Sequence, residues 1–131
     1  ADKLSARPDA VTLMYPVVSM KAGVAHAGSR TNLIGDAPAQ VMVDRYSLEV
    51  APPSTTPPTL LIHAADDESV PVENALMMFE ALREAGVTTS LHVFDSGGHG
   101  FGLRGIEADP RSAWPDLVMD WGRHTGVFRR Q

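Results

Sequence analysis

Three short apolar runs along the chain each predict a β-strand. They cover residues 10–15 (AVTLMY), 59–64 (TLLIHA) and 90–95 (SLHVFD). The first run ends at Pro16, and the second is apolar at nearly every position, which is typical of a strand in a parallel sheet covered by helices on both faces. The sequence therefore predicts three parallel strands in a buried sheet.

Helical spacing follows the second and third runs. One helix is predicted to begin near Pro71 and to stop at Gly86. Its apolar face consists of Val72, Ala75, Leu76, Phe79 and Leu82. A final helix is predicted with Ser112 as its cap and Pro115 in its first turn. Its apolar stripe consists of Trp114, Leu117, Val118 and Trp121. This alternation predicts an α/β fold, a parallel sheet with flanking helices and right-handed crossovers.

Residues 19–58 differ from the rest of the chain because glycines, prolines and polar residues dominate them. We predict a long, loop-rich insertion here, with one helix near residues 38–46. Asp36 is the expected N-cap of that helix and Pro38 lies in its first turn. At 131 residues, the whole chain is at most one domain.

Composition and charge exclude several classes of function. The net charge of −5 argues against a nucleic-acid or anionic-membrane partner, because either needs a basic surface. No apolar run is long enough to span a bilayer, and the absence of cysteine excludes disulfides and thiolate metal sites. The histidines lack the spacing of metal ligands, so we expect neither a metal nor another cofactor.

Polar residues follow the second and third predicted strands. The acidic residues Asp66, Asp67 and Glu68 come after the second, and His99 follows the third within the glycine-rich stretch SGGHGF. Because neighbouring parallel strands end at the same edge of a sheet, an acid and an imidazole are expected to meet there. A carboxylate can hold an imidazole in the orientation in which the imidazole acts as a general base. The alternatives from the residues alone are that the acids cap the next helix and that the glycines only form a turn.

The segments HAADDESVP and SGGHGFG resemble the acid and histidine segments of the α/β-hydrolase superfamily. From about Asp9 to Trp121, the chain resembles the carboxyl-terminal half of bacterial esterases of the acetyl xylan esterase and feruloyl esterase type. The segments that carry this resemblance are LMYPVVSM, AHAGSRTNLIG, RYSLEV, PPTLLIHAADDESVPVENALMMFEALREAGV and LHVFDSGGHGFGL. The resemblance implies that Asp67 is the triad acid and His99 the base, with Asp66 as a spacer.

One part of the family pattern is missing. No G-x-S-x-G nucleophile elbow occurs, and the candidate serines stand in HAGSR, FDSGG and PRSAW. The resemblance therefore implies the last three strands of an α/β-hydrolase fold, with the amino-terminal half, the nucleophile elbow and the oxyanion loop absent. We expect the parent enzyme to be a serine carboxylesterase that deacetylates a sugar or xylan-type ester, and this chain alone to be inactive. A secreted or periplasmic location is implied by the resemblance only.

Two other functions remain open. The chain is alternatively a non-catalytic half domain that associates through its exposed first strand, as a homodimer or with the missing amino-terminal fragment. It is alternatively part of a serine peptidase of the prolyl-oligopeptidase type. The other histidines, His26, His63, His92 and His124, are expected to be structural. Arg30 and Asn32 are the next candidates for contact with substrate or with the acid loop.

Overall fold

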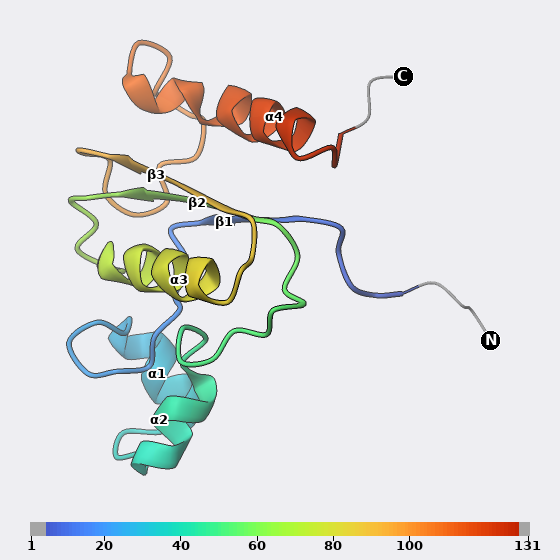
Figure 1. Cartoon of the computed structure of the whole chain (residues 1–131). Coiled ribbons are helices and arrows are strands. Elements are labelled where there is room, and N and C mark those ends of the chain that lie inside the picture. Colours follow the sequence, from blue (N-terminus) through green and yellow to red (C-terminus); the bar gives the residue numbers. More distant parts are fainter. Residues whose placement is uncertain (1–4, 129–131) are drawn as a thin grey trace.

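The computed structural model describes residues 5–128 and contains one parallel sheet of three strands (Figure 1). The strands are β1 (Val11–Met14), β2 (Thr59–Ala64) and β3 (Thr89–Phe94). Their order is β1-β2-β3, so β2 is paired on both sides, with Leu61 opposite Leu13 in β1 and opposite Leu91 in β3. This topology confirms the predicted parallel sheet.

Helices cover both faces of the sheet. In Figure 1, α3 (Glu73–Glu84) lies below the strands and α4 (Trp114–His124) lies above them. Successive residues of a strand point to opposite faces, so Leu61 packs against α3 while Leu60 and Ile62 pack toward Trp121 of α4. All six residues of β2 are buried, which explains its continuous apolar sequence.

The helix after β2 forms nearly as the pattern predicts. It covers Glu73–Glu84, and Gly86 follows the C-cap Ala85 with a φ of +75°, a conformation that glycine adopts without steric cost. The buried residues Ala75, Met78 and Leu82 face the sheet. Leu76, which was expected on this face, is 46% exposed.

The insertion contains more helix than the sequence predicts. Helix α1 (Ala27–Ile34) lies in a region that we expected to be loop, and the imidazole of His26 caps it by accepting a hydrogen bond from the Ser29 amide. Helix α2 (Gln40–Tyr46) is capped by Ala39, so the prediction that Asp36 is its N-cap is wrong. The Ala39 backbone already has the extended conformation of a cap, and no side chain contributes a capping bond.

The start of the last helix also differs from the prediction. Ser112 does not cap α4, because it lies inside a 3₁₀ turn, Pro110–Ala113, that leads into the helix. Asp109 caps this turn by accepting a hydrogen bond from the Arg111 amide. The prediction of Ser112 as the cap is therefore wrong.

A fully buried asparagine joins the insertion to the layer of α3. The Asn74 side-chain oxygen accepts hydrogen bonds from the amides of Val18 and Ser19, both at 3.0 Å, and its nitrogen donates to the Val24 carbonyl. The carboxylate of Glu49, also buried, accepts from the Ser19 hydroxyl at 2.8 Å. The bonds of Asn74 satisfy backbone groups that would otherwise lack a partner, and the bond of Glu49 joins two buried side chains.

Within residues 5–128, no helix is long and apolar enough to cross a membrane.

Candidate active site

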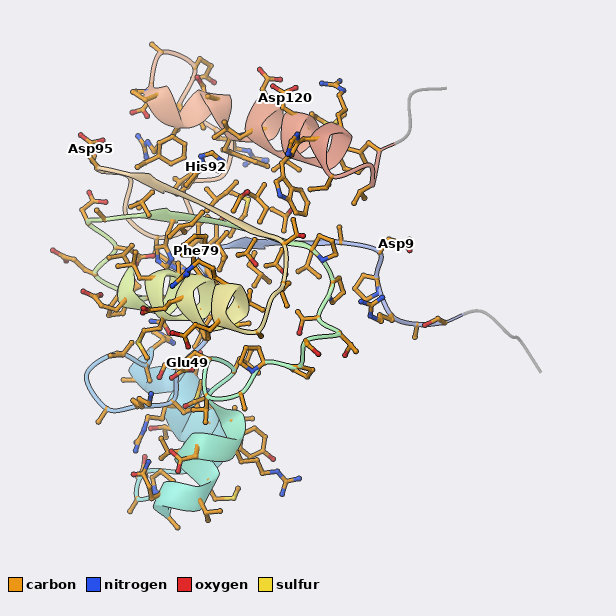
Figure 2. All side chains as sticks on the ribbon, in the orientation of Figure 1. Asp9, Glu49, Phe79, His92, Asp95 and Asp120 are labelled. Atoms are coloured by element: carbon orange, nitrogen blue, oxygen red, sulfur yellow. The ribbon has the colours of Figure 1, made fainter. Side chains whose placement is uncertain are left out.

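The candidate site lies at the carboxyl end of the sheet, where the turn after β2 and the loop after β3 meet. Ala64 and Phe94 are opposite each other at the ends of these strands, and the next amide, that of Ala65, donates to the Phe94 carbonyl at 2.8 Å. The two connections therefore leave the sheet side by side. Figure 2 shows Asp95 at this end of β3.

Asp67 is fixed within the turn after β2. Its Oδ1 accepts hydrogen bonds from the amides of Ser69 at 2.9 Å and Val70 at 2.8 Å, and only 6% of the residue is exposed. An aspartate that accepts from backbone amides two and three residues further on stabilises the turn that it begins. The carboxylate is thus held in one orientation before any contact with His99 is considered.

Three glycines give the His99 loop its path. Gly97, Gly98 and Gly100 all have positive φ, at 151°, 61° and 71°. A β-carbon on Gly97 would also lie 2.7 Å from Cδ of Arg111, so the loop has no room for a larger residue there. The glycines permit a backbone that other residues rarely adopt, and this backbone brings the imidazole back over the acid turn.

The two predicted site residues are in direct contact. His99 Nδ1 lies 2.8 Å from Asp67 Oδ2, a short distance that fits a charge-assisted hydrogen bond. The His99 side chain is 39% exposed, and no residue among 5–128 forms a hydrogen bond to its Nε2. An imidazole that donates from Nδ1 to a carboxylate has Nε2 available as a base.

The charge of Asp67 is favoured in the folded chain. Burial acts to raise the pKa of this carboxyl, but hydrogen bonds from the Val70 amide, from His99 and from the Ser69 amide outweigh burial and hold the pKa below its ordinary value. Asp67 therefore bears a negative charge near neutral pH. That charge fixes the proton of His99 on Nδ1 and stabilises the imidazolium that forms when Nε2 accepts a proton.

Tyr15 follows β1, and its contact with His99 was not predicted. Its ring lies edge-on to His99, with 5.0 Å between ring centroids, and edge-on to Phe101 at 5.2 Å. Its φ of +39° makes it the one non-glycine residue with positive φ in residues 5–128. Strained backbone of this kind persists only where surrounding contacts hold it, and functional sites are a common place for it. The aromatic contact limits the orientations open to the imidazole.

Asp66 is more than a spacer before Asp67. Its Oδ1 accepts a hydrogen bond from the Gly98 amide at 2.8 Å, which joins the acid turn to the histidine loop. The amides of Gly98 and Gly97 hold the pKa of Asp66 below its ordinary value. The expectation that Asp66 only separates the strand from the acid therefore omitted a contact beside His99.

Arg111 holds the same loop from the other side. It donates to the Gly97 carbonyl at 3.3 Å, and its guanidinium lies 5.8 Å from the centre of the Phe101 ring. Two hydrogen bonds to Asp109, at 2.7 and 2.8 Å, fix the guanidinium and lower the pKa of Asp109 to about 2. The loop is thus held by one carboxylate and one guanidinium.

The remaining candidate residues mostly lie away from the acid turn or stabilise the fold. Arg30 donates to the Met20 carbonyl and so stabilises the insertion. Figure 2 shows His92 between the sheet and α4, away from the acid turn. His63 is the exception among the histidines expected to be structural, because its Nε2 lies 3.2 Å from Asp67 Oδ2.

A separate groove of about 440 Å³ lies between α2, residues 47–56 and Met78 of α3. Its walls are mostly apolar and include Leu48, Val50 and Pro52. Neither Asp67 nor His99 lines this groove, so it is not the space above the candidate acid and base.

A parallel sheet with helices on both faces, and with an acid and then a histidine after neighbouring strands, defines an α/β-hydrolase. The sequence comparison is consistent with this class, because residues 11–120 match the sequence profile of the prolyl oligopeptidase family, Peptidase_S9. The chain belongs to this family. The match also confirms the resemblance to α/β-hydrolases stated from the sequence.

Individual relatives show which proteins the chain resembles. It is 40% identical over 101 residues to an acetylxylan esterase of Xylanibacter ruminicola, and 37% identical over 97 residues to endo-1,4-beta-xylanase B of Butyrivibrio fibrisolvens. Each match covers 74% of this chain, but only 21% of the first relative and 15% of the second. The chain thus spans about a fifth or less of the length of these relatives.

The structure of an acetyl ester-xyloside bifunctional hydrolase from Caldicellulosiruptor lactoaceticus is also similar. Its TM-score is 0.86 at 41% sequence identity, over 94% of this chain and 44% of that hydrolase. A carboxylesterase from Lactobacillus plantarum matches 99% of this chain with a TM-score of 0.76 at 25% identity. The fold described here is therefore shared with solved ester hydrolases.

Proposed function

We propose that this chain supplies the acid and the base of a serine esterase, with Asp67 as the acid and His99 as the base. The observation that carries this proposal is the 2.8 Å contact between His99 Nδ1 and Asp67 Oδ2, with Nε2 of the same ring directed to no other described residue. The parent enzyme is then a carboxylic ester hydrolase whose serine is contributed from outside these 131 residues, because no G-x-S-x-G motif occurs among them.

The chemistry follows from the position of the proton on His99. Nε2 accepts the proton of the serine hydroxyl as its oxygen attacks the ester carbonyl, and the imidazolium then gives that proton to the leaving alcohol. In the second half, Nε2 accepts a proton from the water that attacks the acyl-enzyme, and the imidazolium then returns this proton to the serine oxygen as the ester bond to the serine breaks and the acid leaves. The Asp67 carboxylate remains ionised throughout and stabilises each imidazolium.

The proposed substrate is an acetyl ester of a sugar or of xylan. The support is the names of the relatives, which include an acetylxylan esterase and an acetyl ester-xyloside hydrolase. A small-molecule or polysaccharide ester would bind above His99, at the edge of the sheet where Tyr15 also lies. No cofactor takes part in this mechanism.

The test has two samples. The chain is assayed with p-nitrophenyl acetate alone and then with the part of the Caldicellulosiruptor lactoaceticus hydrolase that it does not match, with intact mass measured in parallel. We expect activity only in the mixture, and we expect His99→Ala to abolish it. The matched control is His124→Ala, which removes a histidine at the end of α4 and should retain activity. Equal activity in the His99→Ala and His124→Ala mixtures would refute the proposed base.

A peptidase is the second candidate, since the family bears the name of prolyl oligopeptidase. The same mixture is therefore also assayed with an N-acyl aminoacyl p-nitroanilide. Faster turnover of the anilide than of the acetyl ester would replace the esterase proposal with the peptidase.

The proposed partner of the chain is another strand at β1. The strand order leaves one edge of β1 without a neighbour among the described residues, and an unpaired edge favours strand addition. We propose pairing there with an amino-terminal segment of the family fold or, without it, with a second copy of this chain. Light scattering of the pure chain tests the second case, with a dimer expected and a monomer at high concentration contradicting it.

A further inference from the structure

His63 places a second imidazole on the candidate acid. The side chain is fully buried, and as the residue after Ile62 in β2 it lies on the face of the sheet that α3 covers. Its Nε2 lies 3.2 Å from Asp67 Oδ2 and 2.9 Å from the Val70 carbonyl oxygen. One ring nitrogen thus faces two acceptors in the acid turn.

The other ring nitrogen shows where the proton of His63 resides. Nδ1 is buried and has no hydrogen-bond partner within residues 5–128. Both groups that face Nε2 are acceptors, so a proton on Nε2 makes hydrogen bonds while a proton on Nδ1 would be a buried donor without a partner. The contacts therefore select the Nε2–H tautomer.

This donor completes the coordination of the carboxylate. An ionised carboxylate has about two acceptor positions on each oxygen. On Asp67, Oδ1 accepts from two backbone amides, and Oδ2 accepts from His63 and from His99. A carboxylate held in this way cannot rotate to present a different oxygen to His99 without losing a bond in a buried place.

We propose that His63 is a positioning residue for the acid–base pair, which donates from Nε2 to Asp67 Oδ2 and thereby fixes the oxygen that orients His99. The inference rests on the proposed function, because it concerns the acid of that triad. The same donor reaches the Val70 carbonyl, so His63 also anchors the turn that contains the acid to the end of β2.

A purely structural role would have a different signature. If His63 bonded only to the Val70 carbonyl, its ring would not respond to changes at His99, because no group would be shared. If His63 bonds to Oδ2, the two imidazoles compete for the same oxygen. Removing one donor should then strengthen the hydrogen bond of the other, and this change can be detected at the ring protons.

The experiment measures these protons by NMR on the chain itself. Long-range ¹H–¹⁵N spectra assign the tautomer of each histidine, and the Nε2 proton of His63 and the Nδ1 proton of His99 are followed at low field. We expect the Nε2–H tautomer for His63. We also expect its proton to move to lower field in His99→Phe and to stay unchanged in the control His124→Phe.

Two substitutions at His63 provide the reciprocal test. His63→Leu removes the donor and should move the His99 Nδ1 proton to lower field, whereas His63→Gln offers an amide N–H in its place and should return that proton toward its original position. A proton on Nδ1 of His63, or a His63 resonance indifferent to His99→Phe, would overturn the inference. Both of these measurements use folded chains that retain His63, so they decide the question even where His63→Leu does not fold.

No esterase activity enters this test. If His99→Ala abolishes activity but NMR shows no shared hydrogen bonds at Asp67, the proposed function stands and the role of His63 is refuted. If NMR shows the shared hydrogen bonds but the mixture has no esterase activity, the contact is established and the proposed function is refuted.

Discussion

Replacing Asp67 with asparagine tests how far the candidate acid also stabilises the fold. The substitution keeps the size of the side chain but replaces one acceptor oxygen with a donor. If the amide oxygen remains on the Ser69 and Val70 amides, the new NH₂ group faces the N–H groups of His63 and His99. Rotation of the amide only moves this conflict to the backbone side, so either orientation leaves hydrogen bonds unmade.

The magnitude follows from the burial of the two donors. The Asp67 side chain is fully buried, so the new NH₂ group would be a buried donor without an acceptor, which costs about 1–3 kcal/mol, while the His63 Nε2–H keeps the Val70 carbonyl. The side chain of His99 is 39% exposed and can turn to water, so it adds at most about 1 kcal/mol. We therefore expect Asp67→Asn to lower the free energy of unfolding by about 2–3 kcal/mol at neutral pH.

The effect should depend on pH in a defined direction. Because the pKa of Asp67 is lower in the folded chain than its ordinary value of 3.8, the contribution of the charge is fully present above that pH. It is lost as the pH falls below 3.8 and through the folded-state value. The difference between the native chain and Asp67→Asn should therefore shrink in acid.

Urea unfolding followed by tryptophan fluorescence measures this difference, since Trp121 is buried in the native chain. The control is Asp120→Asn, which changes a carboxylate whose side chain is 76% exposed on the outer face of α4 (Figure 2) and should alter stability by less than about 0.5 kcal/mol. The reasoning fails if Asp67→Asn matches this control at neutral pH, or if its effect is the same at pH 3 and pH 7.

Three further predictions concern neighbouring parts of the structure. Leu61→Ala should lower the free energy of unfolding by about 2–5 kcal/mol in urea, because it opens a cavity against α3; a smaller loss would indicate a loosely packed sheet. Tyr15→Gly should be more stable than Tyr15→Ala by about 1 kcal/mol in thermal unfolding, because only glycine relieves the φ of +39°, and the reverse order would contradict the strain. Asp66→Ala should accelerate hydrogen exchange of the Gly98 amide at neutral pH, whereas an unchanged rate would exclude the bond to Asp66.

The strands and the acid–histidine contact were accessible from the sequence because they depend on strong local patterns. In β2, continuous apolar residues leave few alternatives to a buried strand, and β2 has the predicted bounds. The contact of Asp67 with His99 was expected from parallel topology, since residues after neighbouring strands converge at one edge. Neither inference required knowledge of side-chain packing.

Three other features of the structure have no recognisable pattern in the sequence. Helix α1 has no buried residue, so it lacks the apolar periodicity by which helices are recognised. The role of His63 depends on a turn that brings Asp67 and Val70 back to the end of their own strand, and an apolar run gives no sign of this. The strain at Tyr15 is set by tertiary contacts, because its residue type does not favour positive φ.

The hydrogen bonds that fix the candidate acid and the candidate base all lie within the described residues. Asp67 is held by Ser69, Val70 and His63, and the His99 loop is held by Asp66 and Arg111. None of these contacts needs the nucleophile or the oxyanion loop. A serine supplied from outside these residues would therefore meet a base whose tautomer is already fixed. Adding the part of the fold that contains the serine should start esterase activity and leave the chemical shifts of the His63 and His99 ring protons nearly unchanged.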